Sequence, residues 1–376
     1  MSAAAPLEGV RVVDLTGYVA GPYATMVLAD LGAQVIKVER PGGEVYRRQG
    51  PVFAPGGESA SFLTLNRGKS SAVLDLRSQE GRAALEGLLD EADLLVENGT
   101  PGAMERLGLG FDDLHGRHPR LVYVSISGFG HVGPDAVRGG YDLVLQAESG
   151  LLSMTGHPGQ APAKIPIAAL DFGSGLYAAL GAVAALRERD RTGLGSHVTT
   201  SLLECAMAWL SMHVVTYRLG GDEPSPEGTR SPFFAPYEAY RTQDGHLVLV
   251  GTGGDDAWGR LCGALGLGAA REDPRFADNS ARVENAEALR VLIEDVMGGA
   301  PTAHWVTALG EAGVVCAPVQ GVAAALATPQ VEALGIVGEQ DHPTAGPIPS
   351  VGLPISFDGV RAVSPRPPPL LDDVST

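Results

Sequence analysis

The first forty residues contain two strand patterns with one helix pattern between them. Residues 10–15 (Val-Arg-Val-Val-Asp-Leu) are typical of a buried strand, and Pro22 is typical of the first residue of a helix that runs to about Leu31. Gly32 ends this helix, and residues 34–38 predict a second strand. Because a strand, a helix and a strand in this order form a unit of a parallel sheet, this segment alone predicts an α/β fold.

Further strands and helices follow in the same alternation. The pattern predicts helices over residues 78–91 and 172–189, and strands over residues 93–96, 121–126 and 197–201. We therefore predict a doubly wound, Rossmann-like α/β domain. Sheets of this kind bind ligands beyond the carboxyl ends of their strands.

The chain of 376 residues exceeds the usual size of one domain. Residues 220–227 are rich in Gly, Pro, Glu and Ser, which is typical of a linker, and an Asp-Gly hairpin and three helix patterns follow. We predict a large domain over residues 1–219, which the Pro-rich tail 336–376 completes. A small α+β domain is predicted over residues 228–335.

The net charge of −17 argues against nucleic acids and anionic membranes as partners, because both require a broad basic surface. Cys205, Cys262 and Cys316 lie far apart in apolar segments, so neither a disulfide framework nor a zinc site is expected. The amino terminus does not resemble a signal peptide, and no apolar stretch approaches the ~20 residues of a membrane span. These observations predict a cytoplasmic protein without a membrane partner.

Basic residues gather in one part of this acidic chain. Residues 34–82 contain eight basic and five acidic side chains, which could hold one small anionic ligand. A solvated surface of mixed charge is the alternative. The basic residues are Lys37, Arg40, Arg47, Arg48, Arg67, Lys69, Arg77 and Arg82, and the acidic residues are Glu39, Glu44, Glu58, Asp75 and Glu80.

Residues 128–133 match the Gly-x-Gly-x-x-Gly fingerprint of dinucleotide-binding proteins and directly follow a predicted strand. However, Pro134 and Asp135 stand where the fingerprint requires a helix to begin, which leaves no helix N-terminus for a pyrophosphate. We therefore interpret this segment as a glycine loop that does not bind a nicotinamide cofactor.

Common catalytic motifs are absent from the sequence. The chain has no Gly-x-Ser-x-Gly elbow, no lysine-containing phosphate loop and no His-x-x-x-His pair. Its nine histidines are dispersed, so no metal site is predicted. Any catalysis is expected from an oxygen nucleophile or a carboxylate base.

Asp171 is the lone carboxylate of residues 166–177, and an apolar run leads into it. Small residues and a long helix pattern follow, so Asp171 is expected where a strand or turn meets a helix. A nucleophile fits this position. The alternative is a helix N-cap, for which Asp is a favoured residue.

Many segments, in the same order, resemble the family III coenzyme A transferases. The similarity covers nearly the whole chain, including the predicted small domain. It is carried by residues 7–14, 20–22, 31–42, 65–70, 94–98, 140–142, Gln146, Ala147, Gly150, 191–195, 273–276 and 317–319.

The resemblance implies a function. In that family an aspartate, which falls on Asp171, attacks the thioester carbonyl of an acyl-coenzyme A and forms a mixed anhydride. The chain is then expected to move coenzyme A from an acyl-coenzyme A to a carboxylic acid, with coenzyme A as a substrate and no metal. Because family members form dimers of two interlocked rings, the resemblance also implies a homodimer of this kind.

Matching positions imply which residues contact coenzyme A. Arg40, Arg77 and Arg106 fall near the phosphates and the adenine end, and a guanidinium is well suited to phosphate. Leu74 and Asn98 fall beside the nucleotide. Weak surface ion pairs are the alternative role of these arginines.

The chain departs from the formyl-coenzyme A transferases of this family. Val19 stands where those enzymes have Gln, and residues 231–236 replace their glycine lid, which leaves a later glycine cluster at 251–254. We expect Val19 to lie against the coenzyme A ester. The differences argue against oxalate and formate chemistry and favour a bulkier, more apolar acyl group.

The α-methylacyl-coenzyme A racemases are similar in length and in the Asp-Phe-Gly that begins at Asp171, and they provide the alternative function. Racemisation needs two bases, and that family uses a His where this chain has Tyr141. Because Tyr is a poor base near neutral pH, only His131 or His157 could replace it, and we expect Tyr141 to contact the ester instead. A non-catalytic acyl-coenzyme A binding protein is a third alternative, which Asp171 disfavours.

Overall fold

The structure is a computed structural model that describes residues 5–251 and 255–374. It divides into two compact units, each described by itself. The larger comprises Met1–Leu152, Lys164–Glu223 and Gln330–Thr376, and the smaller comprises Ser153–Ala163 and Pro224–Pro329. The predicted division did not place residues 153–163 in the smaller unit.

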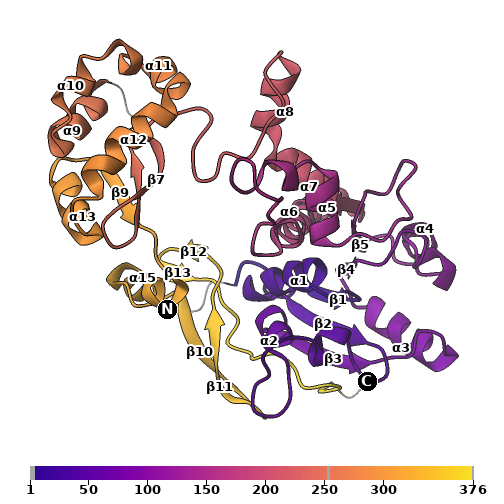
Figure 1. The fold of residues 1–376 in the computed structure, drawn as a ribbon. Coiled ribbons are helices and arrows are strands. Elements are labelled where there is room, and N and C mark those ends of the chain that lie inside the picture. The colour runs from indigo at the N-terminus through magenta and orange to yellow at the C-terminus, as the bar shows by residue number, and fades with distance from the viewer. Residues whose placement is uncertain (1–4, 252–254, 375–376) are drawn as a thin grey trace. The chain divides into compact units, whose positions relative to one another are not determined.

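A parallel sheet of six strands forms the centre of the larger unit (Figure 1). Its strands lie in the order β3-β2-β1-β4-β5-β6, which is the doubly wound arrangement. The order reverses between β1 and β4, so a crevice is expected beyond the carboxyl ends of these two strands. The strands are β1 (Arg11–Asp14), β2 (Gln34–Glu39), β3 (Lys69–Val73), β4 (Leu94–Glu97), β5 (Val122–Ser127) and β6 (His197–Ser201).

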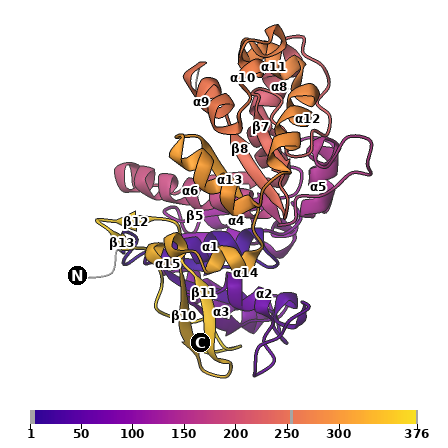
Figure 2. The ribbon, with the colours of Figure 1, turned by 60° about the vertical axis from the view of Figure 1, so that its left-hand side comes forward.

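Helices cover both faces of this sheet (Figures 1 and 2). Helices α1 (Ala20–Asp30) and α6 (Ala169–Thr192) share one apolar core with one face. Helices α3 (Gln79–Leu89) and α4 (Phe111–His115) share a second core with the other face. All four residues of β4 are buried, as expected for a strand that is covered on both faces.

Serine side chains begin three helices of the larger unit, because a serine oxygen can accept an unpaired N–H of the first turn. Ser78 accepts from Gly81 at 2.9 Å before α3. Ser59 and Ser201 cap in the same way. Ser59 begins α2 (Ala60–Leu65), and Ser201 begins α7 (Leu202–Trp209). Two further helices of this unit are α5 (Asp142–Glu148) and α8 (Ser211–Arg218).

The sequence-based expectation that no apolar stretch approaches membrane length was wrong for α6. Among the described residues, this helix of 24 residues is the one that is long and apolar enough to cross a bilayer. Its buried residues, such as Leu170, Ala178 and Ala182, belong to the core beneath the sheet. A core helix therefore explains the same composition.

The carboxyl-terminal segment forms two antiparallel hairpins and then runs along the edge of the sheet. The hairpins pair β10 (Val337–His342) with β11 (Gly346–Val351), and β12 (Ser356–Phe357) with β13 (Val360–Arg361). Beyond them, the Asp373 carboxylate accepts the N–H of Ser71 at 2.7 Å, and Val374 donates to the Ser71 carbonyl at 3.0 Å. The tail thereby covers β3, an edge strand that the sequence did not predict.

The smaller unit is an α+β fold around its own core. The hairpin of β7 (Tyr237–Arg241) and β8 (His246–Val250) was predicted, whereas β9 (Val315–Pro318), which pairs with β8, was not. The glycine cluster expected at 251–254 lies mostly outside the described residues. The helices are α9 (Asp255–Leu265), α10 (Gly268–Arg271), α11 (Asn279–Glu284), α12 (Ala286–Met297), α13 (Thr302–Glu311) and α14 (Val322–Leu326). The next helix, α15 (Pro329–Leu334), belongs to the larger unit from Gln330 onward.

Candidate active site

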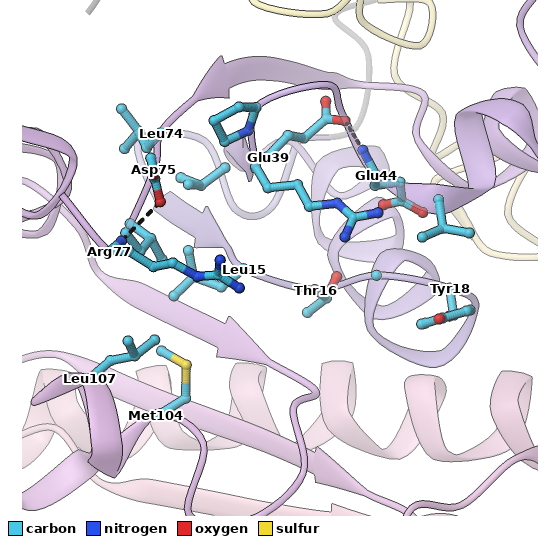
Figure 3. Close-up of a pocket in the computed structure, with 16 residues that line it drawn as sticks. Leu15, Thr16, Tyr18, Glu39, Glu44, Leu74, Asp75, Arg77, Met104 and Leu107 are labelled. Carbon is cyan, nitrogen blue, oxygen red and sulfur yellow. Dashed lines mark hydrogen bonds between the residues drawn. The ribbon is translucent and has the colours of Figure 1, made fainter.

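Two cavities lie at the carboxyl ends of the strands, and Tyr18 lines both of them. The strand-end cavity has a volume of about 660 Å³ (Figure 3) and lies beyond β1, β2 and β3. The Asp171 cavity has a volume of about 210 Å³. It is lined by Tyr18, Val19, Ala20, Tyr46, residues 98–101, residues 126–128, residues 138–141, Asp171 and Leu202.

The loop between β1 and α1 forms the wall that the two cavities share, and buried charges hold its second residue, Thr16. Lys37 Nζ donates to the Thr16 carbonyl at 2.8 Å, and Asp14 Oδ1 accepts the N–H of Thr16 at 2.9 Å. Lys69 pairs with Asp14 at 3.0 Å, and both side chains are fully buried. The network fixes where the loop leaves the sheet.

Asn98 holds the next residue of this loop. Its Oδ1 accepts the N–H of Gly17 at 3.0 Å, and its Nδ2 donates to the Gly17 carbonyl at 2.7 Å. The side-chain amide that was predicted to line a nucleotide therefore joins the loops after β1 and β4. Tyr18 then adopts a φ of 64°, a left-handed conformation that a non-glycine residue takes only at an energetic cost.

Asp171 lies in the first turn of α6 and does not cap it. The N-cap is Ala168, without a side-chain hydrogen bond, so the N-cap alternative for Asp171 was wrong. Asp142 Oδ2 instead accepts the N–H of Leu170 at 2.7 Å and that of Asp171 at 3.4 Å. A carboxylate from the start of α5 thus occupies the amides that usually stabilise an acidic residue at this place.

Burial raises the pKa of Asp171 to about 7, and the negative charge of Asp142 contributes to the rise. No neighbouring cation lowers this pKa among the described residues. Near neutral pH the side chain is therefore divided between its two protonation states. Such a shift in a cavity is typical of a functional group.

Two glycines meet in the wall of the Asp171 cavity. A Cβ placed on Gly140 would lie 2.6 Å from the Cα of Gly128, so the two backbones can approach only without side chains. Gly128 begins the glycine loop for which the sequence suggested no use. The structure makes it part of this wall.

Three tyrosines that come from separate segments line the Asp171 cavity, and we call them the tyrosine cluster (Tyr18, Tyr46 and Tyr141). The rings of Tyr18 and Tyr46 meet edge to face at 5.7 Å, and those of Tyr18 and Tyr141 at 6.0 Å. Of these, Tyr18 and Tyr46 were not predicted, nor was Arg138 in the same wall. Nothing in the spacing of these residues signals their meeting.

Exposed arginines surround the strand-end cavity. Arg40 and Arg77 line it, and Figure 3 shows the Arg77 side chain reaching into it. Arg106 is exposed in the short helical turn after β4, whose neighbouring side chains line the cavity. Within residues 5–251 and 255–374 we find no ion pair that involves any of these three arginines. An apolar part of the lining comes from Leu74, which is 6% exposed.

The basic residues counted between 34 and 82 do not form one patch. Lys37, Arg47, Arg67 and Lys69 are buried, and each pairs with an internal carboxylate. These four are therefore neither available to a small anionic ligand nor part of a solvated surface, which were the two expectations for this segment. Arg40 and Arg77 are the members of the segment that line the strand-end cavity.

The residues predicted to contact coenzyme A divide between the two cavities. Arg40, Leu74 and Arg77 line the strand-end cavity; Val19, Asn98 and Tyr141 line the Asp171 cavity; Arg106 lines neither.

The part of the Asp171 cavity that the structure describes offers no histidine as a second base for racemisation. Among the described residues no histidine lines the Asp171 cavity, and His157 belongs to the smaller unit. No group of three or more His, Cys, Asp or Glu side chains suited to a metal occurs in the described part of the chain.

Comparisons with known proteins agree with one family. The sequence model of CoA-transferase family III matches residues 7–373. The succinyl-CoA:glutarate CoA-transferase of Homo sapiens is 37% identical over 99% of this chain and 84% of its own length. The acetyl-CoA:oxalate CoA-transferase of Acetobacter aceti is 36% identical over 98% of this chain and 93% of its own length.

Solved structures agree with these sequences. A CaiB/BaiF family protein from Brucella suis superposes with a TM-score of 0.87 at 36% identity, over 98% of this chain and 97% of that one. A protein from Mycobacterium tuberculosis superposes with a TM-score of 0.89 at 32% identity, over 99% and 98%. The chain therefore belongs to CoA-transferase family III and is a CoA-transferase.

Proposed function

We propose that this enzyme transfers coenzyme A between acids through an anhydride on Asp171. The observation that carries the proposal is the position of this carboxylate, which faces a small cavity beside the strand-end cavity and has its pKa raised to about 7 by burial. A carboxylate of raised pKa is a stronger nucleophile once it is ionised. The racemase alternative is not favoured, because the family and the named relatives are transferases.

The reaction then has three steps. An Asp171 oxygen attacks the thioester carbon, the carbon–sulfur bond breaks, and the products are an acyl-aspartyl anhydride and the coenzyme A thiolate. The acceptor carboxylate attacks this anhydride, which releases the donor acid and leaves the acceptor joined to Asp171. The thiolate attacks the acceptor carbonyl, and Asp171 leaves as a free carboxylate.

The strand-end cavity is proposed to hold the nucleotide end of coenzyme A. Arg40, Arg77 and Arg106 would pair with its phosphates, which is the charge that exposed, uncompensated guanidinium groups recognise. Leu74 offers an apolar surface beside them. Tyr18 lines both cavities, so the arm of the ester would pass along it on the way to Asp171.

We further propose that the donor and acceptor are short dicarboxylic acids. The relatives are named for succinyl and acetyl donors and for glutarate, oxalate and mesaconate acceptors, and all of these except acetyl are dicarboxylic. The Asp171 cavity is small, and Tyr, Asn, Thr, Ser and Arg side chains make up much of its lining. Such a lining supports a small polar acid better than the bulky apolar group that the loop sequences suggested.

The enzyme is also proposed to act in the cytoplasm as an interlocked homodimer. The three cysteines are unpaired, which suits a reducing compartment. Exposed apolar side chains on α7 and α8, including Trp209, Met212 and Val215, support an interface with a second copy. Light scattering should give twice the mass of one chain, and a monomer would contradict the dimer.

Trapping of the anhydride tests the proposed reaction. The enzyme is mixed with succinyl-coenzyme A and then with hydroxylamine, which converts an activated aspartate into a hydroxamate. Mass spectrometry of the tryptic peptide 165–187 should locate the hydroxamate on Asp171. Asp171→Asn should show no hydroxamate and no transfer, whereas Asp190→Asn, an exposed position on the same helix, should behave as wild type. Full transfer by Asp171→Asn would contradict the anhydride route.

A further inference from the structure

The tyrosine cluster brings together three hydroxyl groups beside Asp171. Tyr18 follows β1, Tyr46 lies in the helical turn of residues 45–48, and Tyr141 directly precedes α5. Tyr18 and Tyr141 are 44% and 63% exposed, so hydrophobic packing does not account for their positions. The strained backbone of Tyr18 also indicates that its ring is held in place for a purpose.

Two hydroxyl groups of the cluster have raised pKa values. A hydrogen bond to Tyr141 raises the pKa of Tyr18, which links the hydroxyl groups of these two residues. Burial and the charge of Asp171 raise the pKa of Tyr46, so this hydroxyl also keeps its proton. The cavity thus offers an O–H donor at Tyr46 throughout the neutral pH range.

The cavity offers an anion little positive charge. Arg138 is the one Lys or Arg among the described residues that line it. Its guanidinium stacks over Phe129 at 4.2 Å and pairs with Asp135 at 3.2 Å and Glu148 at 2.6 Å. Because two carboxylates already compensate this cation, an anionic group that enters depends on neutral donors.

We propose that the tyrosine cluster binds the carboxylate of a dicarboxylic substrate that is not joined to coenzyme A. Tyr46 and Tyr141 donate to its oxygens, and Tyr18 is a positioning residue that orients Tyr141. The inference rests on the proposed function, since it assigns the recognition of dicarboxylic acids to particular residues. A monocarboxylic acid of equal length would leave these donors unpaired in the cavity, and a site built around hydrogen bonds rejects such an analogue.

The test compares succinate with butyrate as acceptors, because the two acids have the same chain length and differ in the second carboxylate. We expect Tyr46→Phe to lower the ratio of kcat/KM for succinate to that for butyrate by about tenfold, as for one lost hydrogen bond to a charged group. Tyr18→Phe keeps the ring and should lower the ratio by about threefold, a smaller effect because it acts through Tyr141. Tyr177→Phe, an exposed position on α6 that lines neither cavity, should leave the ratio unchanged.

An unchanged ratio in Tyr46→Phe would overturn the proposal. An equal loss with both acceptors would overturn it as well, because the hydroxyl would then serve the reacting carbonyl oxygen that both acids share. If Tyr18→Phe does not fold, the kcat/KM ratio of Tyr46→Phe alone tests the proposed binding of the carboxylate. Hydroxylamine trapping on the same proteins separates this inference from the reaction itself, since the tyrosine variants should still form the Asp171 adduct from succinyl-coenzyme A. If the wild-type enzyme forms no hydroxamate on Asp171, this result counts against the anhydride route, whatever the ratio of kcat/KM for succinate to that for butyrate.

Discussion

Asp14 and Asp171 are both buried aspartates of the larger unit, yet their surroundings drive their pKa values in opposite directions. Burial alone raises the pKa of Asp14, but the charges of Lys69 and Lys37 and hydrogen bonds from two threonines lower it to about 2. Asp171 has burial and the like charge of Asp142, and its pKa rises to about 7. The partners of each carboxylate, more than its burial, therefore decide its charge.

The difference corresponds to two tasks. Asp14 lies at the end of β1 and secures the loop that forms the shared wall of the two cavities. Asp171 faces the small cavity, and no cation among the described residues lowers its pKa, so its ionised form is left less stable and more reactive. Ion pairs thus stabilise the residues that support the site, whereas the reacting carboxylate of Asp171 has none in the part of the chain that the structure describes.

The largest expected effect is the loss of stability when Asp14, the supporting aspartate, is replaced. Asp14→Asn leaves Lys69 and Lys37 buried without this carboxylate, and loss of one partner of a buried pair typically costs about 3–5 kcal/mol. Denaturant unfolding at pH 7 should show this loss in the free energy of unfolding. Asp190→Asn, at an exposed position, should change it by less than about 0.5 kcal/mol. Equal stability of Asp14→Asn and wild type would refute the supporting role.

Replacement of Asp171 is expected to raise the free energy of unfolding, whereas replacement of Asp14 lowers it. The folded state raises the pKa of Asp171 from 3.8 to about 7, so the folded protein binds one proton more than the unfolded protein between these values. Stability from this group is therefore present below pH 4 and is lost as the pH rises to 7. Asp171→Asn removes this pH-dependent loss of stability. We expect the variant to have a free energy of unfolding about 2–4 kcal/mol higher than wild type at pH 8, and this difference should disappear near pH 4.

Urea unfolding of wild type and Asp171→Asn across pH 4–8 measures this difference, because contributions from groups that do not interact with Asp171 cancel. A variant that is less stable than wild type at pH 8 would show that Asp171 is stabilised by partners, as Asp14 is. The comparison between the two aspartates would then fail.

Sequence patterns predicted five strands of the sheet and missed β3. The apolar runs in β1, β4 and β5 are visible without a structure, since strands covered on both faces are largely apolar. In contrast, β3 carries Lys69 and Ser71, whose partners Asp14, Glu39 and Asp373 are distant in sequence. A strand that is stabilised by such long-range polar contacts has no local signature.

The site was predicted in part for the same reason. Asp171 was identified from its local sequence and the resemblance, but the helix begins earlier than expected because Asp142, 29 residues before it, accepts the first amides. The tyrosine cluster depends on three loops that only the sheet order brings together. Patterns along the chain report neighbours within a few residues, whereas this cavity is assembled from residues 18 to 202.

The smallest expected effect concerns the binding of coenzyme A. This binding is proposed for the strand-end cavity, whereas the reaction is proposed for the Asp171 cavity. Arg77→Ala removes an exposed cation that has no ion pair among the described residues, so folding should be unaffected. If Arg77 binds a phosphate, the KM for an acyl-coenzyme A should rise about 5–30-fold, as for about 1–2 kcal/mol, with little change in kcat. Arg82→Ala offers a matched control, because Arg82 is basic and exposed nearby but does not line the cavity. A fall in kcat with unchanged KM would instead assign Arg77 to the reacting centre, and the separation of recognition from reaction would not hold.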